Sequence, residues 1–579
     1  MNSNYHFLLL LTFVLVAVQV AAAPHYGNPH FRPPFEADAQ RPDWPDWTDW
    51  TGAAESDSID NVHTVSIPTT AVPSVPISTV TITETSIVSA PVASTPIAST
   101  PITSTLLSSP SVSTTTMSNA TSAAASTPGG VISGPGSTST AGVAQTDSSS
   151  TGNNTTTGRL VFAHFMMGIV SNRKAASDYD LDMQLAKSHG IDAFALNIGT
   201  DSYNDQQLDY AYTSAENNGM KVFISFDFNW WSTDQVGEIA QKVSQYATRP
   251  SQLMLNGKAF VSTFSGDGLD VAALKGGTQI PIHFVPNFSP AKGTSLVEAD
   301  GVFNWMAWPN NGNNRAPDPG QNFNETINAD DQQCLKALSN TTNKDYMAPI
   351  SPWFFTHYGT NVSYAKNWMF PSDTLWYDRW NQILEMGPKL VEIITWNDYG
   401  ESHYVGPLNT TYTDDGASLW TDDMPHDGWL TMAKPYIAAY KDGAKSVDGY
   451  IKADQLVYWY RPQPSSVDCD ATDNTMTGAP SGNFYNGRPN GWEQVADDVF
   501  VVALLTSPGT VTISSGDNSK SFDVPAGATL LRVAMGIGSQ KFSLGRGGQS
   551  VLSGTSAKDI LNSCQKGIYN FNAYVGTVG

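Results

Sequence analysis

The sequence predicts an α/β protein: a (β/α)8 barrel of the TIM type, followed by an all-β sandwich and preceded by a disordered stalk. Three observations predict this arrangement. Residues 63–157 consist almost entirely of Ser, Thr, Pro, Ala and Val. From 158 to 443, apolar runs of strand length alternate with stretches of helical spacing. From 444 to 579, short alternating or β-branched runs follow one another, with Gly, Asn-Ser and Pro between them.

The N-terminal residues 1–23 have the pattern of a secretory signal peptide. The run Phe7–Val20 is almost wholly apolar, and the three alanines at 21–23 supply small residues for cleavage. This run is shorter than the roughly 20 residues that span a bilayer. We therefore expect a secreted protein with no membrane partner after cleavage. An uncleaved membrane anchor is the alternative.

Two segments of low complexity follow, and neither is expected to fold. Residues 24–62 are rich in Pro and carry three Asp-Trp pairs between Asp43 and Trp50, which indicate either an aromatic patch for polysaccharide or an acidic disordered tail. Residues 63–157, with stretches such as STPIASTPITSTLLSSPSVSTTT, cannot bury enough apolar area to offset their chain entropy. Their Ser, Thr and Pro content predicts an O-glycosylated linker.

The predicted barrel, residues 158–443, depends on apolar runs that are typical of buried strands. Helical patterns follow the first three runs, and two of these patterns end at Gly190 and Gly219. Eight alternating units in about 280 residues match a closed barrel, whereas an open doubly wound sheet, the alternative, lacks its GxGxxG turn here. The predicted strands are Leu160–Met167, Ala193–Ile198, Val222–Phe228, Ala259–Phe264, Ile282–Asn287, Gly301–Ala307, Tyr346–Ile350 and Leu390–Trp396.

The C-terminal residues 444–579 are predicted to form a β-sandwich. Runs such as DDVFVVALLT, GTVTISSG and TLLRVAMG alternate in the manner of short antiparallel strands. Cys469 and Cys564 both lie in this part, and in an oxidising compartment we expect them to pair. Cys334 lies in the helical stretch QQCLKAL, where a buried, inert thiol is expected rather than a nucleophile.

Composition excludes several classes of function. The chain has 30 Lys and Arg against 53 Asp and Glu, a formal charge of -23 that repels nucleic acid and anionic membranes. Its three cysteines form no CxxC pattern, and its ten histidines form no HxH or HExxH group. No GxSxG elbow of a serine hydrolase is present. We therefore expect no metal and no nucleic-acid partner. We also expect a monomer.

The side chains at the predicted C-terminal ends of the strands indicate a sugar substrate. In a barrel of this type the reactive groups lie at those ends. The residues there are mostly Trp, Asn and Asp, with almost no Lys or Arg, so indole faces can stack on sugar rings while amides and carboxylates bind hydroxyls. The candidates are His164, Asn197, Asp227, Asn229, Trp230, Trp231, Asn287, Trp305, Trp308 and Trp353.

The loop after the last predicted strand, TWNDYGESHY, is the most informative segment. Asp398 and Glu401 stand three residues apart, with Trp396 and Tyr404 on either side. Glycoside hydrolysis needs two carboxyl groups, one protonated to protonate the departing oxygen and one ionised to activate water or to attack. The alternative interpretation is that both acids are ordinary loop residues that cap the next helix.

Several long motifs, in order, resemble fungal glycoside hydrolase family 71, the α-1,3-glucanases or mutanases. They are RLVFAHFMMGIV, GIDAFALNIG, VFISFDFNWW, YMAPISPWFFTHYG and EIITWNDYGESHYVGPL. The resemblance implies a (β/α)8 barrel, hydrolysis of α-1,3-glucan with inversion, and no metal or organic cofactor. With the signal-peptide pattern, we expect a secreted protein that is extracellular or associated with the cell wall. The segment TWNDYGES is also similar to the WNEWxE segment of endo-α-mannosidase family 99, and by that analogy Asp398 and Glu401 are the functional pair.

The expected roles follow from the mechanism. We assign Glu401 as general acid and Asp398 as general base, with the reverse assignment left open. An inverting pair should be separated by roughly 6.5–9.5 Å. Asp227, His164, Asn197, Trp230, Trp396 and Tyr404 are predicted to bind substrate. Endo action is expected. The alternatives are a non-catalytic cell-wall polysaccharide-binding protein on a decayed barrel and a glycosidase of the endo-α-mannosidase type.

Overall fold

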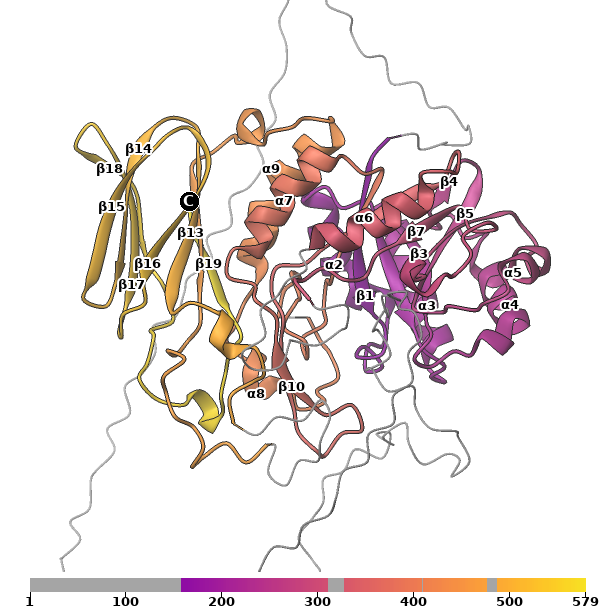
Figure 1. Ribbon diagram of the computed structural model, residues 1–579, viewed down its shortest axis with the longest axis horizontal. Coiled ribbons are helices and arrows are strands. Elements are labelled where there is room, and N and C mark those ends of the chain that lie inside the picture. The colour runs from indigo at the N-terminus through magenta and orange to yellow at the C-terminus, as the bar shows by residue number, and fades with distance from the viewer. Residues whose placement is uncertain (1–157, 311–326, 409, 476–486) are drawn as a thin grey trace, which may run out of the picture. The chain divides into compact units, whose positions relative to one another are not determined.

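The computed structural model describes residues 158–310, 327–408, 410–475 and 487–579 (Figure 1). The predicted signal peptide, the 24–62 segment and the 63–157 linker lie outside the described residues. Within the described residues, no helix has the length and apolar character needed to cross a membrane.

The predicted strands are all present in a nine-stranded sheet. Hydrogen-bonded parallel pairs run from β1 through β2, β3 and β5 to β6, and from β1 in the other direction through β11 and β8 to β7; β4 joins β5 antiparallel. The strands are β1 (Leu160–Met166), β2 (Ala193–Ile198), β3 (Lys221–Asp227), β4 (Met254–Leu255), β5 (Lys258–Phe264), β6 (Ile282–Pro286), β7 (Gly301–Phe303), β8 (Asp345–Ile350) and β11 (Leu390–Ile393).

The prediction of a closed barrel is confirmed only in part, because β6 and β7 form no ladder in the described sheet. At this seam the Asp300 amide donates to the Phe284 carbonyl over 2.8 Å. The Asp300 carboxylate accepts the Phe284 amide over 3.0 Å, and the Asn287 side chain donates to the Phe303 carbonyl over 3.0 Å. One backbone bond and two side-chain bonds thus take the place of a ladder, and the result is a parallel α/β sheet with one open seam.

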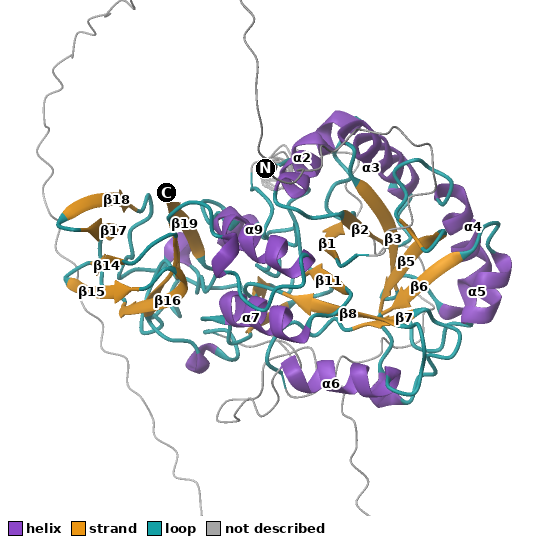
Figure 2. Ribbon diagram, turned by 90° about the horizontal axis from the view of Figure 1, so that it is seen from above, coloured by secondary structure: helices purple, strands orange, loops and turns teal. Residues whose placement is uncertain are grey.

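Helices lie outside the strands (Figure 2). β6 is followed only by the 3-10 turn Pro290–Lys292 before β7, so the strict alternation of strand and α-helix fails at this unit. α3 and α7 end at Gly219 and Gly387, whose positive φ angles of 63° and 64° suit glycine. The helices are α2 (Asp180–Ser188), α3 (Asn204–Asn218), α4 (Val236–Tyr246), α5 (Val271–Gly277), α6 (Ile327–Leu338), α7 (Leu375–Met386), α8 (Ser418–Thr421) and α9 (Asp427–Lys441).

Both faces of the parallel strands are buried, as their continuous apolar runs predict. Along β1, Val161 and Phe165 pack in the core under the helices, whereas Phe162 belongs to a separate cluster inside the sheet. There the rings of Phe162, Phe223 and Phe260 contact one another at centroid separations of 5.0, 5.3 and 4.7 Å. These three rings fill the interior near the N-terminal ends of the strands. The C-terminal ends are left for polar side chains.

The C-terminal part consists of two four-stranded antiparallel sheets, with strand orders β16-β13-β12-β19 and β15-β14-β17-β18. Side chains from both sheets share one core cluster, in which Tyr458 stacks on Phe542 at 4.0 Å. The prediction of an all-β C-terminal part is confirmed. The strands are β12 (Gln455–Tyr460), β13 (Asp498–Leu505), β14 (Gly509–Ser515), β15 (Asn518–Val524), β16 (Gly527–Ala534), β17 (Gln540–Arg546), β18 (Gln549–Thr555) and β19 (Tyr574–Val578).

A continuous core joins this β part to the parallel sheet. Side chains of α9, β12 and β19 belong to the same buried cluster as the helices around the sheet. The Trp353 indole donates to the Phe571 carbonyl over 3.0 Å, and His426 Nε2 lies 2.9 Å from the Ala573 carbonyl oxygen. The predicted boundary between 443 and 444 is therefore crossed by buried contacts.

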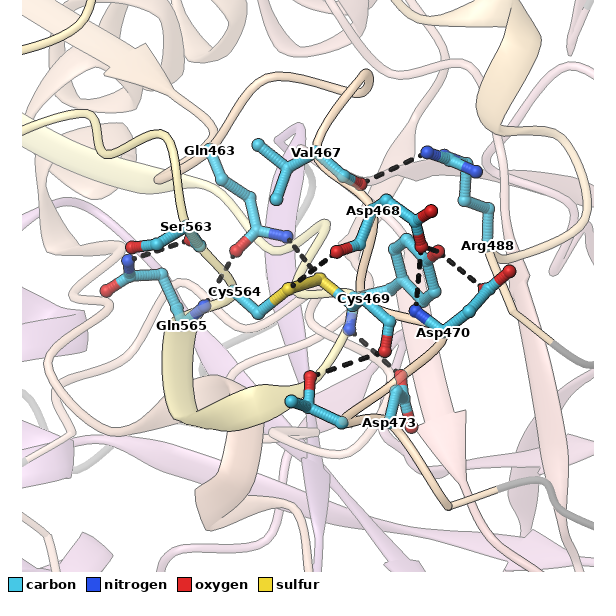
Figure 3. The surroundings of a disulfide bond; sticks show 12 residues. Gln463, Val467, Asp468, Cys469, Asp470, Asp473, Arg488, Ser563, Cys564 and Gln565 are labelled. Atoms are coloured by element: carbon cyan, nitrogen blue, oxygen red, sulfur yellow. Dashed lines mark hydrogen bonds between the residues drawn. A yellow bond between two sulfur atoms is a disulfide. The ribbon is translucent and has the colours of Figure 1, made fainter.

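The predicted disulfide is present and joins Cys469 to Cys564, whose Cα atoms are 5.7 Å apart (Figure 3). Gln463 lies against it: its Nε2 is 3.6 Å from Cys469 Sγ, and its Oε1 accepts the Gln565 amide over 2.8 Å. Cys334 is free and buried, and burial raises the pKa of its thiol. An inert thiol is the outcome expected from its helical position.

Candidate active site

The turn that follows β11 brings the two predicted acids together. The Glu401 amide donates to Asp398 Oδ1 over 3.0 Å, and the side chains of Asp398 and Glu401 are 18% and 15% exposed. A Cβ atom at Gly400 would lie 1.7 Å from the Tyr358 hydroxyl oxygen, so only glycine fits between the acids. Both carboxylates are therefore held on one tight turn and remain open to solvent.

His403 lies on the buried side of the two acids and contacts both. Its Nε2 lies 2.9 Å from Glu401 Oε2 and 3.7 Å from Asp398 Oδ2, and its Nδ1 lies 3.1 Å from Thr395 Oγ1. Burial lowers the pKa of His403 to about 4, although the neighbouring Asp398 carboxylate opposes this effect. The imidazole is therefore neutral across the range in which most glycosidases work.

A cation that the sequence analysis missed also reaches the pair. Lys366 forms an ion pair with Glu401 from β10 (Lys366–Met369), which forms a hairpin with β9 (Phe355–Tyr358) after β8. Burial lowers its pKa to about 8, with Asp398 and Asp415 opposing. Lys366 does not follow a predicted barrel strand, so no local pattern marked it.

An outer edge of the site is formed by Asp415 and two tyrosines. The hydroxyls of Tyr358 and Tyr364 donate to Asp415 Oδ2 over 2.6 and 3.2 Å. Burial raises the pKa of Asp415, and the charge of Asp398 raises it further. The carboxyl of Asp415 is thus electrostatically coupled to the predicted catalytic pair.

A second polar group lies inside the sheet and contains three of the predicted residues. Asp227, at the end of β3, accepts the Asn229 amide over 2.9 Å and a hydrogen bond from Asn197. Burial raises its pKa to about 6, and the partial compensation comes from Asn229, His164 and Asn197. The group therefore holds a carboxyl that takes up a proton at mildly acidic pH.

His164 belongs to the same group and has a partner that the sequence analysis missed. Its Nδ1 lies 2.7 Å from Glu392 Oε1, and both side chains are fully buried. The ring also contacts Trp305 edge-on at 4.9 Å. Glu392 is an acid within the apolar run LVEIITW. A charged residue at a buried strand position could have indicated that it has a polar partner inside the sheet. The two polar groups are linked through the backbone, because the Trp396 amide donates to the His164 carbonyl over 2.7 Å.

Residues 157–579 match glycosyl hydrolase family 71. The chain belongs to this family. It is 45% identical over 425 residues to a mutanase of Penicillium rubens, covering 72% of this chain and 88% of that one. It is 35% identical over 444 residues to the glucan endo-1,3-alpha-glucosidase agn1 of Schizosaccharomyces pombe, covering 74% of this chain and 96% of that one. The family resemblance seen in the motifs is thus confirmed.

Among solved structures, an endo-alpha-mannosidase of family GH99 from Bacteroides thetaiotaomicron aligns with a TM-score of 0.37 and 13% identity, over 49% of this chain and 97% of that one. A likeness this weak carries no argument about the site.

Two residues predicted to bind substrate in this family 71 site are instead buried. Trp396 is 0% exposed; its indole donates to Asp182 Oδ1 over 2.9 Å and packs on Phe194. Tyr404 is also 0% exposed, stacks on His426 at 3.8 Å and donates to the Met424 carbonyl. From 394 to 406 every residue except Asp398 and Glu401 is buried, so proximity in sequence to the acids did not place these rings at the surface.

Trp230 keeps a position that suits a sugar contact. Its side chain is half-buried and packs over Gly199, where a Cβ would lie 3.0 Å from the indole. Trp230 therefore remains a candidate, together with Asp227 and Asn197. His164 is as fully buried as Trp396 and Tyr404 and lies behind Asp227.

Among the described residues, Asp398, Glu401 and His403 form a group that could hold a metal ion. One donor atom of each lies within 4.8 Å of the others. The Lys366 ammonium is paired with Glu401 at the same place. A positive charge there disfavours a metal cation, so we assign no metal to this family 71 site. The absence of a cofactor stays a prediction.

Proposed function

We propose that the protein is an α-1,3-glucanase that cleaves internal bonds of α-1,3-glucan in fungal cell walls. The observation that carries the proposal is the pair of partly exposed carboxylates, Asp398 and Glu401, on one turn at the carboxyl end of β11. The substrate is supported by the relatives, which are named as a mutanase, a glucan endo-1,3-alpha-glucosidase and an ascus wall endo-1,3-alpha-glucanase.

In the proposed reaction Glu401 protonates the departing glycosidic oxygen and Asp398 activates the attacking water. This role requires that a proton replace the Lys366 or the His403 contact at one oxygen of Glu401. Asp227, Asn197 and Trp230 bind the sugar beside the pair. Asp227 and Asn197 offer oxygen and nitrogen atoms to hydroxyls, and Trp230 offers an indole face. His164, held by Glu392, supports Asp227 from within the sheet.

We expect a large loss of activity when either carboxyl is replaced by its amide. Asp398→Asn and Glu401→Gln keep the size of each side chain but can neither carry the negative charge nor give up a proton. Each should lower turnover on α-1,3-glucan by roughly 10²–10⁴-fold, the usual contribution of general acid–base catalysis. Release of reducing sugar and calorimetric unfolding measure the two effects, activity and stability.

Asp423→Asn is the matched control for these variants. Asp423 is an exposed acid with a φ of 62°, a conformation that Asn tolerates well. Its replacement should leave activity unchanged. Near-normal turnover of Asp398→Asn or Glu401→Gln would remove that residue from the mechanism.

We propose inversion of configuration, on the ground of the family resemblance. The geometry does not support it, since one oxygen of Asp398 and one of Glu401 lie within 4.8 Å, below the roughly 6.5–9.5 Å of inverting pairs and near the roughly 5–5.5 Å of retaining pairs.

The stereochemical outcome is directly measurable. Cleavage of an α-1,3-linked oligosaccharide with inversion should release the β-anomer first, which a proton NMR time course detects before mutarotation. A first-formed α-anomer would contradict inversion and would make the acid nearest the anomeric carbon a nucleophile, while leaving the carboxyl pair itself in place.

A protein that only binds wall polysaccharide is the second candidate, and the alternating Asp-Trp pairs at 43–50 favour it for that segment. Retention on insoluble α-1,3-glucan without release of reducing sugar would support it. We also propose that the protein is secreted after removal of residues 1–23. Sequencing the N-terminus of protein from the culture medium tests that proposal.

A further inference from the structure

We propose that His403 is the positioning residue of the carboxylate pair: a neutral imidazole, held in one tautomer by Thr395, that donates its Nε2 proton to Glu401 and holds this side chain beside Asp398. The proposal rests on the proposed function, because it takes Asp398 and Glu401 as the reacting acids. It adds two residues, His403 and Thr395, that act through the pair and touch no substrate.

A chain of hydrogen bonds determines the tautomer. The Asp398 amide donates to Thr395 Oγ1 over 2.8 Å and occupies one of the two lone pairs of this hydroxyl. A carboxylate can only accept, so the contact of Glu401 with Nε2 leaves Nδ1 as the acceptor, and the Thr395 hydroxyl, 3.1 Å away, donates to it. A neutral imidazole whose Nδ1 accepts carries its proton on Nε2. That nitrogen lies 2.9 Å from Glu401 Oε2, so it donates to this carboxylate.

The backbone holds Thr395 and His403 opposite each other. The Thr395 amide donates to the His403 carbonyl over 2.9 Å, and the Val405 amide donates to the Thr395 carbonyl over 3.1 Å. The imidazole is also flanked by the rings of Trp308 and Phe354, at centroid distances of 5.2 and 5.7 Å. The chain of donors is thus built on a buried, hydrogen-bonded frame.

Burial keeps the ring neutral, although two of the charged groups around it are carboxylates. The groups that face it are Asp398 and Glu401 on its own turn, Lys366 on β10, and His426 at the start of α9. Burial and the Lys366 charge lower the pKa of His403 to about 4, against the opposing effect of Asp398. A general acid or base that works near neutral pH needs a pKa near that pH, so this imidazole is suited to donate a hydrogen bond and not to transfer a proton.

Matched pairs of variants in the full chain test the proposal. Thr395→Ser keeps the hydroxyl that determines the tautomer, and Thr395→Val removes it. His403→Gln keeps an N–H donor near the position of Nε2, and His403→Leu removes it. Each variant is assayed on a soluble α-1,3-linked oligosaccharide from pH 4 to pH 8, and its unfolding is followed by calorimetry.

We expect Thr395→Ser and His403→Gln to stay within about 10-fold of the normal kcat, with both limbs of the pH profile unchanged. Thr395→Val and His403→Leu should lower kcat by roughly 100-fold with little change in KM, since small misplacements of a catalytic group have effects of that size. The Thr395 pair and His403→Gln decide the question if His403→Leu fails to fold.

Two results would overturn the proposal. If His403→Gln is as inactive as His403→Leu, or loses a limb of the pH profile, then His403 itself transfers a proton. If Thr395→Val is as active as Thr395→Ser, the tautomer is not held by Thr395. Failure of the proposed function gives a different pattern, in which Asp398→Asn and Glu401→Gln are active whatever the His403 variants do.

Discussion

Asp227, in the second polar group, is a carboxyl whose pKa the fold raises. It lies at the end of β3 with a side chain almost sealed from solvent, and burial raises its pKa from 3.8 to about 6. The Asn229 amide and the Asn197 side chain bind the ionised form but do not offset the loss of water. A sugar hydroxyl that binds here therefore meets a group whose donor or acceptor character depends on pH.

This shift makes a prediction about stability. Because the pKa is raised on folding, the protonated form stabilises the native state below about pH 4, and this contribution is lost as pH rises through about 6. Asp227→Asn cannot ionise and does not lose this contribution. Its free energy of unfolding, relative to that of the wild type, should therefore rise by up to about 3 kcal/mol between pH 4 and pH 7. Urea unfolding at several pH values measures the difference.

Asp423→Asn, the same substitution at an exposed acid outside the sheet, is the control. An unchanged gap between Asp227→Asn and the wild type over this range would mean that Asp227 is solvated in the native protein.

The turn after β11 is anchored to α2 by a side chain that sequence analysis had placed in the substrate site. The Trp396 indole donates to Asp182 Oδ1 over 2.9 Å, and Asp182 Oδ2 accepts from the Arg173 guanidinium over 2.8 Å. The Arg173 and Asp182 side chains are almost completely buried, so each needs its partners. The element that carries Asp398 is therefore held by a buried charge pair, and packing alone does not position it.

We expect Trp396→Phe to destabilise the protein and to lower activity together. The phenyl ring keeps much of the packing but removes the donor to Asp182 Oδ1, which costs about 1–3 kcal/mol for a buried acceptor. Calorimetric unfolding and turnover on α-1,3-glucan are measured side by side.

Trp380→Phe is the matched control, since Trp380 is also fully buried and its indole nitrogen has no hydrogen-bond partner among the described residues. It should lose packing only and keep normal turnover per folded molecule. Equal effects of the two substitutions would show that the Trp396 hydrogen bond has no role in placing the turn.

At the scale of the whole molecule, the parallel sheet and the β part are joined by a shared core. Trp429 of α9 contacts Trp353 on one side and Trp459 of β12 on the other, at 6.2 and 6.1 Å between ring centroids. A Cβ at Gly428 would lie 2.8 Å from Val575 of β19, so helix and strand approach closely there. The β part completes the burial of α9.

A chain truncated after residue 443 is therefore expected not to fold. It would expose Trp353 and Trp429, which are buried in the full structure. Binding of an apolar dye, together with loss of the near-ultraviolet circular dichroism, reports this outcome. A chain of residues 158–579 keeps every described contact and should fold. Native dichroism and activity of the 158–443 chain would show instead that the parallel sheet is independent.

Short segments of the sequence were sufficient to predict the strands of the parallel sheet and the antiparallel C-terminal part. They also predicted the disulfide and the proximity of Asp398 and Glu401. These features follow from the period of apolar side chains, from the spacing within one turn and from the number of cysteines, all of which are local or compositional. The family followed from motifs of the same kind. The closed barrel did not follow, because the seam depends on how the Asp300 and Asn287 side chains meet β6 and β7.

The surroundings of the acids depended on the tertiary structure. Lys366 reaches Glu401 from a hairpin 35 residues earlier, and Glu392 meets His164 across 228 residues. The sequence determined that this protein would carry two acids at the end of a buried strand. Which side chains face them, and whether Trp396 is open to sugar or buried against Asp182, was determined only by the packing of distant segments, because burial and hydrogen bonding depend on neighbours in space.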